Sequence, residues 1–452
     1  MNSGLFGTTG VRGVFNTGFT VEMALKLGLA LGTYVNGQRI LIARDTRTSA
    51  ATVEAAFISG ASSCGCDIYD LGITTTPTLA YLTKKLDANA GVIVTASHNP
   101  PEYIGVKFWS RTGQGYTSDK EQEIERIYDS GDFKKCSWSD VGKILRIEYA
   151  ENYHIDDILA NIDRETIRKR GFRIAVDTGN GAAYSIAPKL LRELNCRVLS
   201  LNSQPDGFFP GRPSAPSEKS LTTMISTLKN GEYDLGVAFD GDADRIMLID
   251  HEGNLIAGDQ MIAAISRYLL KGTKGKIITT IESSIMVEDI VKKCGGELIV
   301  TAVGDINLSL GISKYNAIFG GEECGVFIWP RFHLGPDSLF TLAWILETLA
   351  KNNMKLKEFV EGINLYPVVR GSVQCSNAKK QQVMRMISKE VANLQGVVGV
   401  EAMDGLNVKM RDCRLLVRPS GTEPLIRIMA EGRSITACEK IVEKIRALIT
   451  KF

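Results

Sequence analysis

Short runs of apolar and β-branched residues, each ending in polar or glycine-rich residues, recur along the chain and lead into segments of helical period. The clearest lie at residues 39–43, 91–95, 172–176 and 276–281. Strand–loop–helix units of this kind build parallel sheets, so the pattern predicts a mostly α/β protein. The units recur roughly a hundred residues apart without clear residue identity, which leaves an ancient internal repeat open.

The last part of the chain has a different order of elements. Residues 415–417 and 426–428 predict two strands around a turn, and a helix is expected at about 434–450. That helix places six apolar residues on one face: Cys438, Ile441, Val442, Ile445, Leu448 and Ile449. We expect a separate small α+β domain here, with joints between domains near 143–153, 251–253 and 362–371.

Composition narrows the class of protein. At 452 residues and 44% hydrophobic content, the chain is long enough for three or four domains. Its 53 basic and 51 acidic residues give no sign of a nucleic-acid or anionic-membrane surface, so we expect a small-molecule partner. Nine scattered cysteines, no signal peptide and no long apolar run predict a cytoplasmic protein with reduced thiols.

The most informative motif is Asp240-Gly241-Asp242-Ala243-Asp244-Arg245, which lies between the apolar runs 235–239 and 246–249. Three carboxylates so close together repel one another unless a cation is present, and hard oxygen ligands suit Mg²⁺. An EF-hand does not fit, because Arg245 stands at its sixth position and His251 at its twelfth. A solvated acidic turn is the alternative, and the apolar flanks argue against it.

A second motif, Thr95-Ala96-Ser97-His98-Asn99-Pro100-Pro101, follows a predicted strand and ends in two prolines. Ser97 is therefore expected on a rigid turn, with His98 beside it and Lys107 ten residues later. A hydroxyl nucleophile with proton-handling and cationic neighbours is what covalent phosphoryl transfer requires. The alternative is that Ser97 only terminates the strand.

Two further turns are candidates for binding substrate. Arg418-Pro419-Ser420-Gly421-Thr422-Glu423-Pro424, with Arg427 beyond it, offers hydroxyls and guanidinium groups to a phosphate. The alternative is a plain hairpin turn, which the arginines on both sides argue against. Gly320-Gly321-Glu322-Glu323-Cys324-Gly325 could offer a carboxylate to sugar hydroxyls, although such a loop is more often a structural turn than a sugar site.

The N-terminal segment Phe6-Gly7-Thr8-Thr9-Gly10-Val11-Arg12-Gly13 is glycine-rich and carries one cation, and by itself it could be only a flexible end. No complete dinucleotide-binding fingerprint follows a strand, because Gly179-Asn180-Gly181 lacks the third glycine. There is also no Walker motif, so an ATPase is not expected.

These five motifs, in their order along the chain, resemble those of the α-D-phosphohexomutase family. The resemblance implies four domains around a central cleft, with limits near 1–150, 151–251, 252–365 and 366–452. The first three would share a mixed α/β sheet topology, and the fourth would be a smaller, mobile α+β lid. The ligand would be a phosphosugar, and the protein a monomer or homodimer.

The resemblance also implies a mechanism. Phosphorylated Ser97 would give its phosphoryl group to a hexose 6-phosphate or 1-phosphate, and the resulting 1,6-bisphosphate, which also serves as activator, would turn over before phosphate returns. Mg²⁺ would bind this phosphate together with Asp240, Asp242 and Asp244. The remaining candidates are Arg12, His98, Lys107 and Arg245 at the transferring group, Gly304, Glu322 and Cys324 at the sugar, and Arg418, Ser420, Gly421, Thr422 and Arg427 at the other phosphate.

Three departures from the family pattern put the preferred sugar in question. Cys324 and Val326 stand where relatives often carry serine and histidine, Ile104 replaces an asparagine and Thr9 an aspartate; His333 is a candidate to compensate. The N-terminal motif resembles the phosphoglucosamine mutases more than the phosphomannomutase/phosphoglucomutase branch, which stays open as the alternative. A metal-dependent sugar phosphatase and a non-catalytic phosphosugar sensor are the other two hypotheses.

Overall fold

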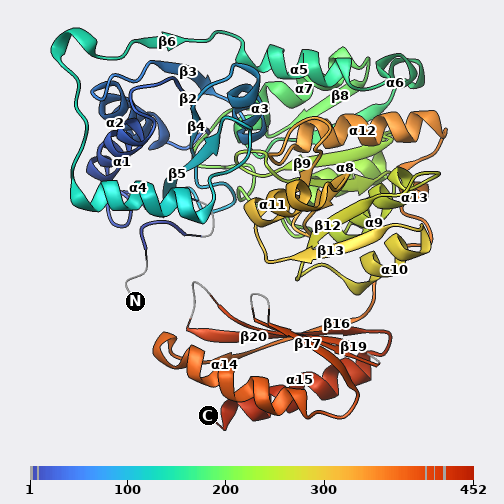
Figure 1. The fold of residues 1–452 in the computed structure, drawn as a ribbon. Coiled ribbons are helices and arrows are strands. Elements are labelled where there is room, and N and C mark those ends of the chain that lie inside the picture. Colours follow the sequence, from blue (N-terminus) through green and yellow to red (C-terminus); the bar gives the residue numbers. More distant parts are fainter. Residues whose placement is uncertain (1–3, 8–9, 403–404, 412, 421–423, 452) are drawn as a thin grey trace.

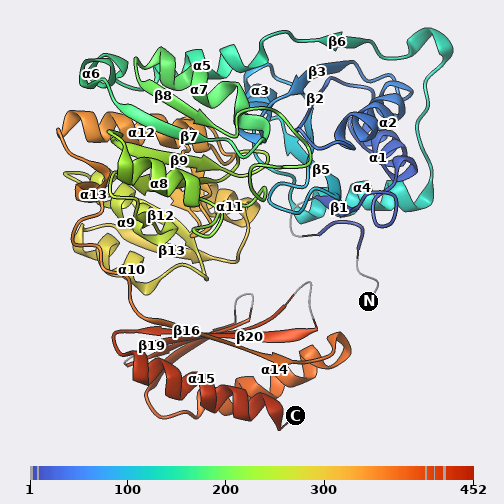
Figure 2. The same ribbon diagram turned by 180° about the vertical axis from the view of Figure 1, so that it is seen from behind.

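A computed structural model describes residues 4–7, 10–402, 405–411, 413–420 and 424–451 of the chain. Three mixed α/β sheets with their helices pack against one another, and a fourth, antiparallel sheet lies apart from them (Figures 1 and 2). The predicted fold class, three mixed α/β domains and a smaller C-terminal α+β domain, is confirmed.

The first sheet has six strands in the order β1-β5-β4-β2-β3-β6. The expected strands at 39–43 and 91–95 are β2 and β4, each within one residue of the prediction. The elements are β1 (Val11–Val14), α1 (Val21–Tyr34), β2 (Ile40–Arg44), α2 (Ala50–Ser62), β3 (Ile68–Ile73), α3 (Thr76–Lys85), β4 (Ala90–Val94), β5 (Tyr103–Ser110), α4 (Ser118–Ser130), a 3-10 turn (Trp138–Asp140) and β6 (Ile144–Arg146).

The second sheet has the order β11-β10-β9-β7-β8. The expected joint at 251–253 is a turn between β10 and β11 of this same sheet, so the sheet continues past it to Ile256. The elements are α5 (Ala150–Ala160), α6 (Arg164–Arg170), β7 (Arg173–Asp177), a 3-10 turn (Ala182–Tyr184), α7 (Ile186–Glu193), β8 (Arg197–Leu201), α8 (Thr222–Asn230), β9 (Leu235–Phe239), β10 (Ile246–Asp250) and β11 (Leu255–Ile256).

The third sheet is the smallest, with the order β13-β12-β14-β15. Its elements are α9 (Gly258–Leu269), β12 (Lys276–Thr280), α10 (Ile285–Lys293), β13 (Glu297–Thr301), α11 (Asp305–Tyr315), β14 (Phe319–Gly321), β15 (Phe327–Ile328), α12 (Ser338–Lys351) and α13 (Leu356–Phe359).

The three sheets share one pattern of strand pairing. In the first sheet, β2 pairs in parallel with β3 and β4, and β4 pairs with β5 in antiparallel fashion. In the third sheet, β12 pairs in parallel with β13 and β14, and β14 pairs with β15 in antiparallel fashion. The second sheet follows the same rule with β7, β8, β9 and β10. The loops at 95–102, 240–245 and 322–326 therefore occupy the same place in three copies of one motif.

The fourth domain is an antiparallel sheet in the order β16-β20-β19-β18-β17, with two helices on one side. Its buried side chains form a core of their own, whereas one large cluster contains buried residues from all three preceding domains, beside smaller clusters within each of them. A separate core allows this domain to change its orientation as a unit. Its elements are β16 (Val368–Gln374), α14 (Asn377–Ala392), β17 (Val397–Ala402), β18 (Leu406–Met410), β19 (Cys413–Pro419), β20 (Leu425–Gly432) and α15 (Ile435–Thr450).

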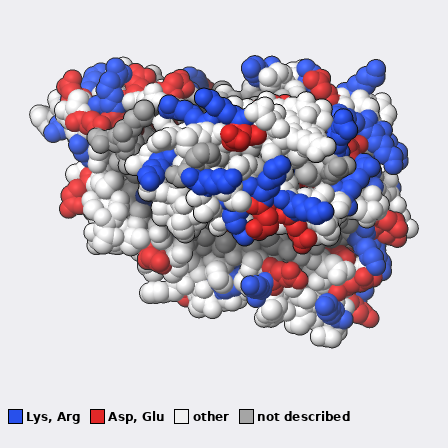
Figure 3. Space-filling view, turned by 90° about the horizontal axis from the view of Figure 1, so that it is seen from below, with Lys and Arg blue, Asp and Glu red and all other residues white. Residues whose placement is uncertain are grey.

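The predicted C-terminal helix is α15, and five of the six residues expected on its apolar face are buried, with Leu448 partly exposed. Within the described residues all nine cysteines are free thiols, and no helix there has the length and apolar character to cross a membrane. Seen from below, basic and acidic side chains are interspersed over the surface (Figure 3).

Candidate active site

Ser97 lies on a tight turn directly after β4. Its backbone is left-handed, with a φ of 51°, and the residue is 1% exposed. The Ser97 N–H donates to Thr95 Oγ1 over 2.8 Å. A left-handed non-glycine residue persists only where its surroundings hold it, so the hydroxyl is fixed in place.

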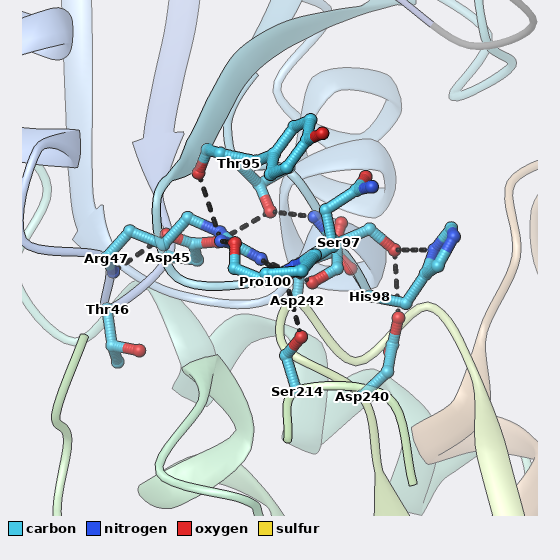
Figure 4. A network of polar contacts seen from close by, with 12 residues as sticks. Asp45, Thr46, Arg47, Thr95, Ser97, His98, Pro100, Ser214, Asp240 and Asp242 are labelled. Atoms are coloured by element: carbon cyan, nitrogen blue, oxygen red, sulfur yellow. Dashed lines mark hydrogen bonds and ion pairs between the residues drawn. The ribbon is translucent and has the colours of Figure 1, made fainter. Parts of the chain in front are cut away.

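Two residues that the sequence did not single out, Arg47 and Asp45, hold this turn through hydrogen bonds. Arg47 is fully buried and donates to the carbonyls of Ser97 at 2.8 Å and Asn99 at 2.7 Å. Asp45 Oδ2 accepts from Arg47 Nε at 3.0 Å and from Thr95 Oγ1 at 2.7 Å (Figure 4). In the sequence, the only feature that pointed to these residues was the carboxylate of Asp45 at the end of the predicted strand 39–43.

The Ser97 turn meets the acidic loop of the second sheet. Ser97 Oγ donates to Asp240 Oδ2 over 2.9 Å, as Figure 4 shows. Gly241 passes so close that a Cβ atom there would lie 2.6 Å from the carbonyl oxygen of Ser97. Glycine at this position lets the two loops touch.

The three aspartates of the acidic loop are buried, and each offers an oxygen within 4.8 Å of the others. Burial, with the charges of Asp244 and Asp242, raises the pKa of Asp240 well above its usual value. Lys107 Nζ donates to Asp242 Oδ2 at 3.2 Å and to Asp244 Oδ2 at 2.8 Å. Burial alone would raise the pKa of Asp244, but the charges of Lys107 and Arg245 outweigh it and lower that pKa.

The acidic loop fits a hard divalent cation. Asp242 Oδ1 and Asp244 Oδ1 are both buried, and neither has a hydrogen-bond partner in the described part of the chain. Buried carboxylate oxygens without a hydrogen-bond partner destabilise the folded state unless a cation binds them. Carboxylate oxygens at a rigid turn are the donor set of Mg²⁺ rather than of a soft metal.

The other catalytic candidates surround Ser97. Arg12 Nη1 donates to Asn99 Oδ1 at 3.1 Å, and the Arg245 N–H donates to Asp240 Oδ1 at 3.2 Å. His98 Nδ1 lies 3.4 Å from Ser97 Oγ. Burial, together with the charges of Arg245 and Arg12, lowers the pKa of His98 to about 4, so this imidazole is neutral at physiological pH.

The three candidates for sugar contact also come together. Glu322 Oε1 accepts from the Gly304 N–H at 2.7 Å, and its Oε2 lies 3.7 Å from Cys324 Sγ. Gly325 has a φ of 95° and packs against the Ile246 carbonyl, which ties this loop to the strand after the acidic loop. Burial raises the pKa of Glu322 to about 7.

The departures from the family pattern have different locations. Ile104 is fully buried in the core of the first domain, and Val326 is buried in the third. His333 is buried and its imidazole is hydrogen-bonded to Asp337, the N-cap residue of α12. Its imidazole therefore lies in a packed cluster and does not stand in for the missing histidine. Thr9 lies outside the described residues.

The predicted phosphate loop joins β19 to β20. Arg418 and Arg427 are paired across these strands, and the Arg418 guanidinium contacts the carboxylate of Glu282 from the third domain. Both arginines line a cavity of about 710 Å³ between the third and fourth domains, with Glu323 also on its wall. Ser420 is buried at the end of this turn. Gly421 and Thr422 lie outside the described residues.

Comparison with known families matches the chain along nearly its whole length. Models described as phosphoglucomutase/phosphomannomutase alpha/beta/alpha domains I, II and III match residues 3–135, 152–253 and 257–366. The model of the C-terminal domain of the same proteins matches residues 373–448.

Curated relatives are similar over their full lengths. A "Probable phosphoglucosamine mutase" of Thermococcus kodakarensis is 40% identical over 99% of this chain and 98% of its own. One from Methanopyrus kandleri is 39% identical over 95% and 94%. Among solved structures, a phosphoglucomutase/phosphomannomutase family protein from Burkholderia thailandensis is 25% identical, with a TM-score of 0.87 and coverage of 98% and 97%.

Proposed function

Because the chain belongs to the α-D-phosphohexomutase family and is therefore an isomerase, we propose that its substrates are glucosamine 6-phosphate and glucosamine 1-phosphate. The observation that carries the mechanism is the Ser97 hydroxyl, held 2.9 Å from Asp240 inside a buried ring of charges. A phosphoryl group attached to Ser97 would therefore lie against the acidic loop.

In the proposed reaction the free C1 or C6 hydroxyl oxygen of the sugar phosphate bonds to phosphorus as the Ser97 Oγ–P bond breaks. The proton of that sugar hydroxyl ends on Ser97 Oγ, which leaves as the free Ser97 hydroxyl. The resulting 1,6-bisphosphate turns over in the cleft, and its other phosphoryl group returns to Ser97. Phosphorylated Ser97 is regenerated, so the net reaction moves a phosphoryl group between the C1 and C6 ends of the sugar.

The chain's own residues supply the positioning and most of the charge. Asp240, Asp242 and Asp244 would hold Mg²⁺, which when bound neutralises charge on the oxygens of the transferring group. Lys107 fixes two of these carboxylates in place. Arg12 and Arg245 bring positive charge to the same place, which stabilises a transition state with dispersed negative charge.

The third and fourth domains would bind the rest of the substrate. Glu322 would accept hydrogen bonds from sugar hydroxyls, next to Gly304 and Cys324. Arg418 and Arg427 would hold the phosphate that is not reacting, because guanidinium groups bind phosphate oxygens in pairs. A hydrolase has no need to hold the second phosphate, which argues against the phosphatase hypothesis.

The choice of the amino sugar rests on the relatives. The proteins similar over the full chain carry the name phosphoglucosamine mutase, at about 40% identity. A more distant structure, Aspergillus fumigatus N-acetylphosphoglucosamine mutase in complex with GlcNAc-6P and magnesium, has the same fold at 14% identity and a TM-score of 0.64. A broad phosphomannomutase/phosphoglucomutase activity is the second candidate, since Cys324 and Val326 change the sugar loop.

Intact-protein mass spectrometry with peptide mapping, combined with an assay for isomer formation, tests the proposal. We expect phosphate on Ser97 after charging with glucose 1,6-bisphosphate, and formation of glucosamine 1-phosphate from the 6-phosphate in the presence of Mg²⁺. Ser97→Ala should abolish both. Ser130→Ala, at the exposed end of α4, is the matched control and should behave like the wild type.

Three outcomes would overturn parts of this proposal. Release of inorganic phosphate without isomer formation would indicate a phosphatase. Faster turnover of mannose or glucose 6-phosphate than of glucosamine 6-phosphate would move the protein to the second candidate. A Ser97 that no bisphosphate can charge would support the sensor hypothesis.

A further inference from the structure

A second buried polar cluster lies where the first three domains meet. It consists of His154 on α5, His333, and Asp337 at the N-terminus of α12, all of them fully or almost fully buried. His154 Nε2 and His333 Nε2 each lie 2.9 Å from Asp337 Oδ2. The other oxygen, Asp337 Oδ1, accepts from the Phe340 N–H at 2.8 Å and caps α12.

The cluster has the residue types of a zinc site, but its hydrogen bonds exclude one. The Gly335 N–H donates to His333 Nδ1 at 3.1 Å, so the proton of a neutral His333 is on Nε2 and points at Asp337. A metal at Asp337 would need a lone pair on that same Nε2. Burial lowers the pKa of His333, which keeps its imidazole neutral.

His154 continues this chain of bonds into the first domain. Its Nδ1 lies 3.0 Å from Thr78 Oγ1, which in turn lies 2.8 Å from Thr75 Oγ1, the N-cap of α3. With Nε2 donating to Asp337, Nδ1 accepts from the Thr78 hydroxyl. His154 therefore connects the first turn of α3 to the first turn of α12, and α5 contacts both helices.

The same two helix ends hold the acidic loop. On α3, the Thr76 N–H donates to the Asp242 carbonyl at 2.9 Å, and Thr76 Oγ1 donates to Asp242 Oδ2 at 2.6 Å. On α12, Ser338 Oγ donates to the Ala243 carbonyl at 2.6 Å. Ala243 has a φ of 58°, a conformation that costs energy in a residue with a side chain and needs such support.

We propose that His154 is a positioning residue for the metal loop, acting through α3 and α12. Thr78 lies two residues after Thr76, and Asp337 directly precedes Ser338, so the imidazole sets the spacing of the two helix ends that hold Asp242 and Ala243. This inference rests on the proposed function, in which the acidic loop binds Mg²⁺.

A merely structural role would be served better by apolar residues. Burying three polar side chains costs solvation energy, and well-packed hydrophobic residues of similar size are often at least as stabilising. A network in which every donor has an acceptor holds its side chains in a single arrangement, which apolar packing does not do as strictly. Partners of this kind behind metal ligands typically change metal affinity about 10- to 100-fold when they are lost.

The test uses His154→Phe, which keeps a ring stacked on Tyr81 but removes both hydrogen bonds. A second variant, Thr78→Val, removes one hydroxyl with almost no change of shape. We expect Mg²⁺ binding, measured by calorimetry on the dephosphorylated protein, to weaken about 10-fold or more in both. The kcat should fall, while the KM for glucosamine 6-phosphate should stay near the wild-type value.

Ile158→Ala is the matched control, because Ile158 is fully buried on the same helix and has no polar group. It should lower the melting temperature without changing Mg²⁺ affinity. Wild-type Mg²⁺ affinity in both His154→Phe and Thr78→Val would overturn the inference. So would stoichiometric zinc in the purified protein that is lost in His154→Phe. A wild type that binds no Mg²⁺ would overturn the proposed role of the acidic loop itself.

Discussion

Ser97 and Asp240 are 143 residues apart in the chain, yet the Ser97 hydroxyl donates a hydrogen bond to the Asp240 carboxylate over 2.9 Å. The contact joins the hairpin loop of the first sheet to the corresponding loop of the second. The candidate phosphoryl carrier and the candidate metal ligands therefore form one site, which no single domain contains.

Mg²⁺ should raise the melting temperature, because its proposed binding to the native acidic loop would relieve the repulsion among the carboxylates. Asp240→Asn removes one ligand, and we expect it to lose this Mg²⁺-dependent increase and to lower kcat on the order of 100-fold or more. Thermal unfolding with and without Mg²⁺ measures the first effect. Asp132→Asn, in the exposed segment after α4, should respond to Mg²⁺ as the wild type does.

Gly241→Ala should impair catalysis by pushing two loops apart. The new methyl group would lie 2.6 Å from the carbonyl oxygen of Ser97, and backbone at that distance must move. We expect kcat to fall about 10-fold or more, because small misplacements of reacting groups are costly. Gly399→Ala, where a Cβ meets nothing within 4 Å, is the control. Equal kcat values for the two variants would contradict the close approach of the loops.

The imidazole of His98 should stay neutral from about pH 5.5 upward. Burial and two nearby guanidinium groups lower its pKa from 6.5 to about 4. Between these two values the unfolded state binds more protons than the native state. The stability contributed by the buried neutral His98 is therefore present above about pH 6.5 and is lost as the pH falls through 4. Ring-nitrogen NMR of the four histidines, with His98→Gln for assignment, measures this. A midpoint near 6.5 for His98 would contradict its burial among the arginines.

Glu322 gives stability a pH dependence of opposite sign. Burial raises its pKa from 4.5 to about 7, so the native state binds more protons than the unfolded state between these values. The stability contributed by this group is present below about pH 4.5 and is lost as the pH rises through 7. Relative to Glu322→Gln, the free energy of unfolding of the wild type should therefore fall by an amount on the order of 3 kcal/mol over this range. Denaturant titrations at several pH values measure the difference, and parallel curves would rule out the shift.

Glu282→Gln should strengthen binding of phosphate to the fourth domain. The Glu282 carboxylate contacts the Arg418 guanidinium, so it competes with a phosphate for the same donors. We expect inorganic phosphate to bind several-fold more tightly to the variant, as measured by calorimetry. If Glu282 instead contacts the sugar, glucosamine 6-phosphate will bind more weakly and inorganic phosphate will be unaffected.

Much of the fold followed from local patterns. Apolar runs bounded by turn residues located β2, β4, β7, β9, β10 and β12 to within a residue or two, and helical period located α15. Such patterns report which face of an element is buried, and burial is a property of each element by itself. The turn at 251–253, expected as a joint, is a hairpin turn between β10 and β11. A hairpin turn and a linker have the same polar, glycine-containing composition, so a local pattern does not separate them.

The sequence by itself determined the chemistry of each loop: acids between apolar strands, a serine stopped by two prolines, and arginines flanking a turn. Only the tertiary structure decided that the Ser97, acidic and Glu322 loops occupy one place in a repeated sheet and converge. It also revealed the hydrogen bond from Arg47 to the Ser97 carbonyl and the link from His154 to the acidic loop. These contacts join residues far apart in the chain, and their partners depend on how whole sheets and helices pack, which no local pattern encodes.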